Sequence, residues 1–447
     1  MARTIPWWPK ETALRYTPVL QVYLVCLVSL VHLVQPNKQN KPNEPNELDS
    51  ETMPFKNFIP PRRLLLGPGP SMVHPRVLHA LSTPLLGHLD PAFLALMDDI
   101  QAMLRVVFQT KNHFTIAVSG TGSAGMEASI VNIVEPGDAV IIGVNGLFGT
   151  RLATIVERCG GKAILVEAPW GQIIEPDAIE AALRRSSPVK AVAIVHAETS
   201  TGAWQPLEPI ANLCRNHDTL FVVDAVTSLG GAPVEIDRWG IDVCYSATQK
   251  CLSCPPGLSP FTLSDRAMAA IRARRTPCQS WYLDMALIAD YWAEGSRAYH
   301  HTAPISMLYA LREALRLVEE EGLPARFTRH RLNGDALAAG LTELGLSPLP
   351  PIEHRLPMLT CVTVPAHIPE AKIRASLLST YGIEIGGGLG PLKGKVWRIG
   401  LMGESSTEAY VLTLLKALED LFIRDGWLST PGTALRAAAR VYGPKKP

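Results

Sequence analysis

Short apolar segments alternate with helical stretches between residues 114 and 246, and this alternation constrains the fold more than any other feature. The expected strands span residues 114–119, 139–144, 163–167, 191–196, 220–224 and 243–246. Strands separated by helices form a mostly parallel sheet that helices cover on both faces. Ligands of such sheets bind at the carboxyl ends of the strands. We therefore expect an α/β fold with its functional side chains at those strand ends.

The pattern changes after Asp265. Residues 304–322 and 324–345 predict two long helices, and apolar segments and helices alternate again up to residue 422. A chain of 447 residues is long enough for one large domain and a smaller one. We expect an N-terminal extension over residues 1–53, a large domain over 54–303, a smaller α+β domain over 304–425 and a loosely held tail over 426–447.

The N-terminal extension contains an apolar run, VLQVYLVCLVSLVHLV, over residues 19–34, followed by a Pro/Asn-rich tract over residues 35–47. The run is short for a membrane helix, which needs about 20 apolar residues. It has the length of a signal-peptide core, but no clear small-residue cleavage site follows it. The tract is expected to be a disordered linker. Three interpretations stay open: a targeting or anchor segment, a prefix removed by processing, and an extension upstream of a true start at Met53.

Charge and cysteine usage restrict the partners and the compartment. The 42 Lys and Arg nearly balance the 41 Asp and Glu, so no basic footprint for nucleic acid or an anionic membrane is present. Only Cys251 and Cys254 of the eight cysteines lie close together, and one such pair is a weak indication of zinc. We interpret them as free thiols, which favours a reducing compartment. We expect a cytoplasmic protein, with mitochondrial import or membrane anchoring through the N-terminal extension as the alternative.

Lys250 ends the segment YSATQK at residues 245–250 and precedes the loop CLSCPPG at residues 251–257. A strand that enters a Pro/Gly loop can deliver one amine into a cleft. An amine with a lowered pKa reacts with a carbonyl cofactor to form a Schiff base. Most lysines are solvated surface charges, so the interpretation of Lys250 depends on the motifs that accompany it.

Two upstream motifs match such a cofactor. Asp224 ends the apolar run at residues 220–224, where a buried acid is costly unless it meets a cation or a donor. The protonated pyridine nitrogen of pyridoxal phosphate is such a partner. The turn SGTGSAGMEA at residues 119–128 leads into a helical pattern, and free N–H groups at a helix start bind phosphate. A phosphate turn, Asp224 and Lys250, in this order, therefore indicate pyridoxal phosphate.

These motifs resemble the class V, fold-type I pyridoxal-phosphate aminotransferases, and in particular the alanine:glyoxylate (serine:pyruvate) aminotransferases. The resemblance spans about residues 64–422. Its motifs are LLGPGPS at 65–71, SGTGSAGME at 119–127, HAETSTG at 196–202, Val223-Asp224, Gln249-Lys250, YHHT at 299–302 and VWRIG at 396–400. It implies a homodimeric transaminase with shared active sites that moves an amino group from alanine or serine to glyoxylate or pyruvate.

The resemblance also implies residue roles. Lys250 would form the Schiff base and then move the substrate α-proton, while Asp224 would keep the pyridine nitrogen protonated. Arg398 would bind the substrate carboxylate. The other expected cofactor contacts are Thr121, Gly122, Ser123, Phe148, Thr199, Val226 and Gln249, with Tyr299 and Thr302 supplied by the neighbouring subunit. Gly69 and Thr199 are expected at the substrate.

Four further positions bear on the expected cofactor contacts and on a possible metal site. Ser123 and Phe148 stand where animal enzymes of the resembled group carry His and Trp, and a Phe can still stack on the cofactor ring. His300 and His301 cannot both face one metal ion from a strand, because adjacent residues face opposite sides, and the resemblance implies that they form a structural pair. No metal site is expected.

Two other interpretations stay open at this point. A lyase of the same fold, similar to cysteine desulfurases, would need a nucleophilic cysteine on a mobile loop. Cys361 is the only late cysteine, and it lies in an apolar run that is typical of a strand. A non-catalytic scaffold without a cofactor is disfavoured because Lys250, Asp224 and Arg398 are all present.

Overall fold

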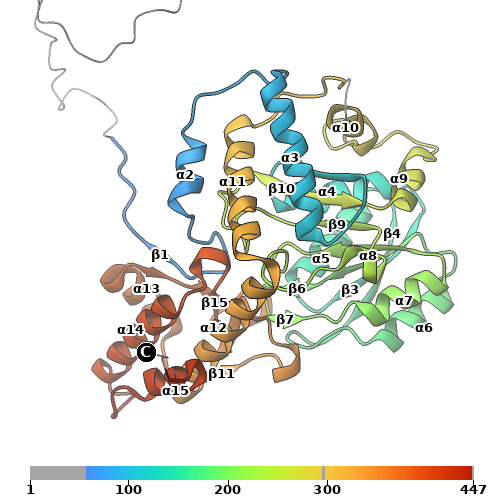
Figure 1. Cartoon of the computed structure of the whole chain (residues 1–447). Coiled ribbons are helices and arrows are strands. Elements are labelled where there is room, and N and C mark those ends of the chain that lie inside the picture. Colours follow the sequence, from blue (N-terminus) through green and yellow to red (C-terminus); the bar gives the residue numbers. More distant parts are fainter. Residues whose placement is uncertain (1–56, 294–296, 445–447) are drawn as a thin grey trace, which may run out of the picture. The chain divides into compact units, whose positions relative to one another are not determined.

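The structure is a computed structural model that describes residues 57–293 and 297–444 (Figure 1). The N-terminal apolar run and its linker lie outside the described residues, so the interpretations of that segment are not tested. The contacts divide the chain at Pro61, and the description below concerns the unit that starts at Arg62. None of the helices in the described part of the chain has the length and apolar character to cross a membrane.

A seven-stranded sheet flanked by helices forms the larger part of this unit (Figure 1). Its strand order is β2-β10-β9-β8-β5-β3-β4. The strands are β2 (Phe114–Ser119), β3 (Ala139–Val144), β4 (Lys162–Glu167), β5 (Ala191–Val195), β8 (Leu220–Asp224), β9 (Val243–Tyr245) and β10 (Leu258–Leu263). All run parallel except β10, which pairs antiparallel with both β2 and β9. The expected α/β class and the mostly parallel sheet are confirmed.

The strand β10 was not expected from the sequence. It contains Pro260, and a proline within a run argues against a central strand because it cannot donate a hydrogen bond. The strand tolerates this residue because the carbonyl group of Pro260 still accepts a hydrogen bond from the Ser246 N–H at 2.8 Å. A short hairpin of β6 (Ala197–Glu198) and β7 (Ala203–Trp204) was also not expected.

Some of the helices around the large sheet begin at a residue whose side chain caps them. At α3, the carboxylate of Asp90 accepts a hydrogen bond from the Ala92 N–H at 2.8 Å. The helices are α2 (Pro75–Leu81), α3 (Pro91–Phe108), α4 (Gly122–Ile133), α5 (Leu147–Arg158), α6 (Pro176–Ser186), α7 (Glu208–Asn216), α8 (Ile236–Trp239), α9 (Asp265–Arg272), α10 (Met285–Trp292) and α11 (Ile305–Glu321).

A four-stranded sheet in the order β11-β12-β15-β14 forms the smaller C-terminal part (Figure 1). Its strands are β11 (Ser347–Pro348), β12 (Leu359–Thr363), β14 (Gly386–Gly387) and β15 (Val396–Gly400). The helices are α12 (Leu323–Glu343), α13 (Glu370–Tyr381), α14 (Glu408–Arg424) and α15 (Thr433–Tyr442). A separate parallel pair joins β1 (Leu64–Leu65) to β13 (Ile383–Glu384), so the chain touches the smaller part before it enters the large sheet.

The two parts have separate hydrophobic cores. The first includes Leu308, Leu311 and Val318 of α11, and the second begins at Ala336 of α12 but also includes Leu66. The domain limits at residues 53 and 303 stay predictions. The packing of α11 with the first core favours a boundary near the junction of α11 and α12 instead.

The expectation of a loosely held tail is wrong for residues 433–442, which form α15. Ala434 and Ala438 of this helix are buried in the second core. The buried carboxylate of Glu419 holds its start by accepting hydrogen bonds from the N–H groups of Gly432 at 2.9 Å and Ala434 at 2.7 Å. The hydrophobic pattern does not predict this helix, because its buried face consists of alanines rather than large apolar residues.

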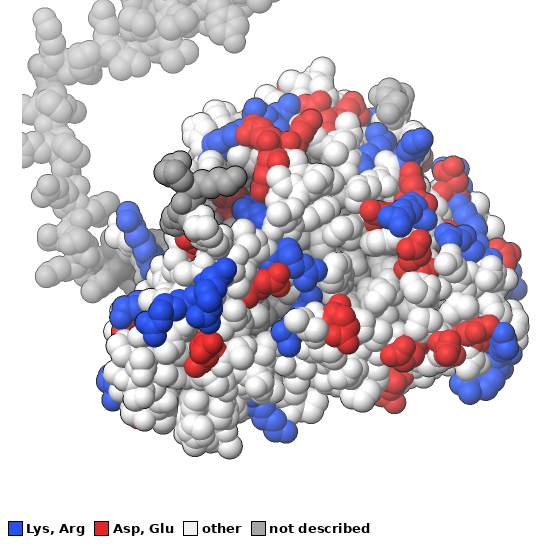
Figure 2. All heavy atoms as spheres, turned by 60° about the horizontal axis from the view of Figure 1, so that its bottom comes forward, with Lys and Arg blue, Asp and Glu red and all other residues white. Residues whose placement is uncertain are grey.

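Basic and acidic side chains are interspersed over the face of the molecule shown in Figure 2, in agreement with the net charge of +1.

Candidate active site

A cavity of about 210 Å³ lies at the carboxyl edge of the large sheet. Loops that follow β2, β3, β5, β8 and β9 reach it together, because parallel strands end at the same edge. Its lining residues are Thr121, Gly122, Ser123, Met126, Phe148, Arg151, Val195, Ala197, Thr199, Asp224, Val226, Thr227, Gln249 and Lys250. The structure thus brings together all the expected cofactor contacts except Tyr299 and Thr302.

Lys250 presents its amine to this cavity from the loop after β9. The Nζ atom donates a hydrogen bond to the carbonyl oxygen of Pro68. Burial lowers the pKa of Lys250 to about 8, and the nearby positive charge of Arg398 acts in the same direction. A larger share of the amine is therefore unprotonated near neutral pH than in an exposed lysine.

Gly69 is required where the backbone passes Lys250. Its φ of +103° lies in the region that favours glycine. A Cβ atom at this position would also lie 2.8 Å from the Nζ of Lys250. On the other side, the Ser71 hydroxyl donates a hydrogen bond to the carbonyl oxygen of Lys250 at 2.8 Å. The segment that contains Gly69 and Ser71 therefore fixes the position of the lysine, and Gly69 lies beside the amine as expected.

Asp224 is buried at the end of β8 with fixed partners. One carboxylate oxygen accepts a hydrogen bond from the Val226 N–H at 2.8 Å, and the other accepts one from the Tyr245 hydroxyl at 2.9 Å. Burial raises the pKa of Asp224 to about 6 in spite of these donors. A cationic group in the cavity would therefore be stabilised next to this carboxylate.

The N-terminus of α4 lines part of the cavity. Thr121 precedes the helix without making a side-chain capping bond, and the first N–H groups of a helix have no partners within it. Gly122 allows a close approach of this turn to Ala247, since an added Cβ atom would lie 2.7 Å from the Cβ of Ala247. The amide oxygen of Gln249 is buried without a hydrogen-bond partner in the described part of the chain.

Arg398 approaches the cavity from the smaller part of the molecule. It is buried on β15, where its Nε donates to the carbonyl oxygen of Gly387 at 2.7 Å and its Nη1 donates to that of Thr199 at 3.2 Å. These two bonds orient the guanidinium group, and its remaining N–H groups are suited to a carboxylate. Thr199 also lines the cavity, and the charge of Arg398 lowers the pKa of Lys250, so Arg398 lies near the cavity although it is not among the residues that line it.

Tyr299 and Thr302 lie outside the cavity of their own chain. Tyr299 is 58% exposed, and its hydroxyl is 3.3 Å from that of Thr302. The neighbouring histidines have structural contacts, since the Nδ1 atoms of His300 and His301 are 2.7 Å apart and the ring of His300 stacks on Trp281. No group of three or more His, Cys, Asp or Glu within residues 57–293 and 297–444 is placed to hold a metal ion.

Sequence reasoning missed Arg151 and Tyr245. Arg151 follows Phe148 by three residues on α5, so its guanidinium lies over the Phe148 ring at 5.0 Å from the ring centre and donates to the Ser123 hydroxyl at 3.3 Å. Tyr245 pairs directly with Asp224 in the register of β8 and β9. The spacing of three and the matching strand ends were the signals available in the sequence.

The thiols of Cys251, Cys254 and Cys361 do not suit a lyase. Cys361 is buried within β12, and burial raises its pKa to about 12, so it is neither mobile nor a ready nucleophile. Cys251 and Cys254 are free and buried, and burial raises the pKa of each thiol.

Comparisons with known proteins point to one family. The aminotransferase class-V family model matches residues 65–394. The (S)-ureidoglycine–glyoxylate transaminase of Bacillus subtilis is 43% identical over 400 residues, which are 86% of this chain and 96% of that protein. The alanine–glyoxylate aminotransferase of Rattus norvegicus is 41% identical over 363 residues, 80% of this chain and 87% of that protein. The crystal structure of an alanine–glyoxylate aminotransferase from Nostoc sp. matches with a TM-score of 0.81 and 51% identity, covering 84% of this chain and 99% of that one.

Proposed function

The chain belongs to the class V aminotransferase family, and on that premise we propose that it uses pyridoxal 5'-phosphate to transfer the amino group of alanine or serine to glyoxylate or pyruvate. Lys250, Asp224 and the N-terminus of α4 meet in one cavity, and this is the observation that supports the proposal most. Pyridoxal phosphate carries an aldehyde, a basic ring nitrogen and a phosphate, and the cavity offers one complementary group for each.

The residues fit this cofactor on physical grounds. A ring N–H⁺ would give the buried Asp224 the cation that its raised pKa shows it to lack. A phosphate would occupy the N–H groups at the start of α4, with the charge of Arg151 beside Ser123 in support. The amide of Gln249, whose oxygen has no partner among the described residues, would complete its hydrogen bonds there after a simple rotation of the amide group.

When bound, pyridoxal phosphate supplies an aldehyde that takes up amino groups and a ring that withdraws electrons from the substrate α-carbon. The amine of Lys250, which its lowered pKa leaves unprotonated more often near neutral pH, would take the proton from that α-carbon and deliver it to the cofactor carbon that carried the aldehyde. Asp224 keeps the ring nitrogen protonated. Arg398 holds the substrate carboxylate, which fixes the α-hydrogen toward Lys250. The amino donor reacts in one half of the cycle, and the oxo acid collects the amino group in the other.

The choice of substrates is supported by the relatives and by the size of the site. Glyoxylate occurs in the names of both the B. subtilis and the rat relative. The carbonyl group of Pro68 and the backbone of Gly69 lie against the lysine, and Gly69 has no side chain to fill the space there. Arg398 can bind one carboxylate, while Arg151 already donates a hydrogen bond to the Ser123 hydroxyl. A small monocarboxylic amino acid fits this arrangement.

We further propose a homodimer in the cytoplasm. Tyr299 and Thr302 would complete the phosphate site of the partner, which is supported by the 58% exposure of Tyr299 and the 62% exposure of nearby Trp281. Aromatic side chains of this size are enriched at interfaces. The free cysteines of the described chain are consistent with a reducing compartment.

The visible absorption spectrum of the purified protein tests the proposal. After loading with pyridoxal phosphate, the visible cofactor band should fall on addition of L-alanine or L-serine and return on addition of glyoxylate or pyruvate, while D-alanine leaves it unchanged. Including (S)-ureidoglycine among the donors tests the activity named for the B. subtilis relative. If the protein never acquires the band, the proposal is contradicted and the interpretation as a non-catalytic scaffold remains. Sulfide release from L-cysteine would favour the lyase.

A further inference from the structure

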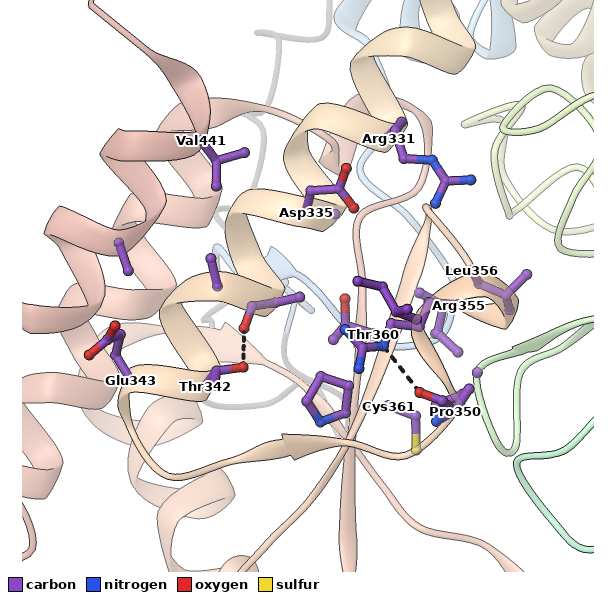
Figure 3. Close-up of a pocket in the computed structure, with 18 of the residues that line it drawn as sticks. Arg331, Asp335, Thr342, Glu343, Pro350, Arg355, Leu356, Thr360, Cys361 and Val441 are labelled. Carbon is purple, nitrogen blue, oxygen red and sulfur yellow. Dashed lines mark hydrogen bonds between the residues drawn. The ribbon is translucent and has the colours of Figure 1, made fainter.

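A second pocket, of about 690 Å³, lies in the smaller C-terminal part of the molecule (Figure 3). One wall is a face of α12, and the opposite wall is the segment from Pro348 to Cys361, with α15 closing one end. We call it the α12 pocket. We propose that the α12 pocket is a binding site for a small organic carboxylate, separate from the active site.

The pocket is hollow because its helical walls carry small side chains. Ala338 and Ala339 lie on one face of α12 and Ala437 faces them from α15, whereas Gly334 lies close against the backbone of Pro357. Buried apolar residues of the other wall, including Leu356, remain in contact with this space. A pocket of this volume with apolar walls and a few convergent polar groups is typical of a small-molecule site.

Two arginines provide charge at one end of the pocket. Arg331 and Asp335 project from α12 toward the segment that carries Arg355 (Figure 3). The guanidinium of Arg331 lies over the ring of Trp204, 5.2 Å from its centre, and Arg355 uses its Nε to donate to the Pro350 carbonyl oxygen at 3.1 Å. Within residues 57–293 and 297–444, neither arginine has a carboxylate oxygen within ion-pair distance. Their remaining N–H groups are thus available to a ligand.

The balance of charge selects the kind of ligand. Asp335 is close enough for both arginines to influence its carboxyl group, so this end of the pocket has one positive charge in excess. The other charged lining residues, Glu343 and Arg440, pair with each other at 3.4 Å and cancel. One carboxylate matches the excess, and a planar guanidinium binds it through two parallel hydrogen bonds. The apolar space beyond then holds an uncharged carbon skeleton.

The wall of the α12 pocket that faces α12 is connected to the active site. Cys361 of this wall pairs with Arg398 in the register of β12 and β15. Gly202, which also lines the pocket, belongs to the turn after Thr199, whose carbonyl oxygen accepts a hydrogen bond from Arg398. The Leu356 N–H donates to the Gly202 carbonyl oxygen at 3.1 Å. A ligand that shifts the wall at Leu356 is therefore expected to alter substrate binding at Arg398.

Calorimetric titration of the cofactor-loaded full-length protein with hexanoate tests the site. We expect hexanoate to bind and hexanamide, the neutral analogue, to bind at least about 10-fold more weakly, because hydrogen bonds to a charged group are lost.

Arg331→Gln and Arg355→Gln should each raise the Kd for hexanoate by about 10-fold or more. Arg184→Gln, on the exposed face of α6, is the matched control and should leave the Kd unchanged. Ala338→Leu, which fills the pocket but keeps its charges, should also weaken binding.

Arg398→Gln separates the two sites, because hexanoate could also bind at the active site. Binding that survives in Arg398→Gln and is lost in Arg355→Gln supports the proposal. The opposite pattern, or no binding at tens of millimolar hexanoate, would overturn it.

The connection to Arg398 is measured as the KM for L-alanine with and without saturating hexanoate. We expect a change of about 5-fold in the wild type that is absent in Arg355→Gln. An equal change in both proteins, or none in the wild type, would overturn the connection. This second measurement rests on the proposed transamination, whereas the calorimetry does not, so the two can fail separately.

Discussion

The active-site cavity and the α12 pocket differ in how their charged side chains are held. In the cavity, Asp224 accepts hydrogen bonds from a backbone N–H and from Tyr245, and Lys250 is bonded to the Pro68 carbonyl oxygen. In the α12 pocket, the contacts within the described part of the chain place Arg331 over an aromatic ring and bond the Arg355 side chain to one carbonyl oxygen. Groups with fixed partners are pre-organised for chemistry, while groups with spare donors suit reversible binding.

The difference follows from the layers that build each pocket. Parallel strands end at one edge of the large sheet and bring loops from distant parts of the chain to a single point. The α12 pocket instead arises where alanines on two helices leave space that large side chains would fill. Substitutions in the first pocket should therefore affect catalysis strongly, and those in the second only the binding of its own ligand.

Lys250→Ala should have the largest effect. We expect the transamination rate to fall by about 10⁴-fold, because proton transfer by a positioned group contributes about 10²–10⁴-fold and attachment of the cofactor is lost as well. Steady-state kinetics with L-alanine and glyoxylate measure the loss. Lys111→Ala, at an exposed lysine, is the control. A variant that retains a tenth of the activity would show that Lys250 is not the catalytic amine.

Arg398→Lys should have the next largest effect, mainly on binding. The lysine keeps the charge but loses the planar pair of donors, so the KM for L-alanine should rise by about 10- to 100-fold with a smaller change in kcat. Arg316→Lys, on an arginine that pairs with Glu313 on the surface of α11, provides the matched comparison. If the KM stays the same, another group binds the substrate carboxylate.

Tyr245→Phe should change the pH dependence of cofactor binding. The affinity of the cofactor-free protein for pyridoxal phosphate should fall as the pH drops through about 6, because Asp224 then becomes protonated and loses its charge. Removing the Tyr245 hydroxyl takes away a donor to the charged form, which raises the pKa of Asp224 and moves this midpoint up by about one pH unit. Fluorescence titrations at several pH values measure the shift.

Tyr309→Phe, whose hydroxyl contacts Leu86 away from the cavity, is the control for that shift. Equal midpoints in the wild type and Tyr245→Phe would mean that the tyrosine does not tune the acid.

The sequence was sufficient for the large sheet and for most of the cavity because the signals there are local. A run such as residues 220–224 is apolar up to its last residue, so both the strand and the position of Asp224 at its end could be predicted. The same holds for residues 114–119 and the helix start that follows. The parallel topology then brings these functional residues together, because it places the carboxyl end of every such strand at one edge of the sheet.

Features that depend on packing across the chain could not be predicted in this way. The strand β10 contains a proline and is defined by its neighbours β2 and β9 rather than by its own pattern. The helix α15 depends on the distant carboxylate of Glu419. The small residues of α12 that line the second pocket have the same spacing as residues that allow close helix packing, and only the tertiary structure distinguishes the two.

Arg331→Gln should have the smallest effect and tests the distinction between the two pockets most directly. Without an added carboxylate, kcat/KM for L-alanine should stay within about twofold of the wild type, since Arg331 touches neither the cavity nor Arg398 in the contacts described. The contact with Trp204 is lost, and a cation–π contact at such a site contributes about 0.5–1 kcal/mol, so calorimetry should show a melting temperature lower by no more than a few degrees. Arg331→Lys, which keeps the charge over the ring, should recover part of that loss. A fall in kcat/KM of about tenfold would mean that the α12 pocket belongs to the catalytic site, and the two regions would then have to be treated as one.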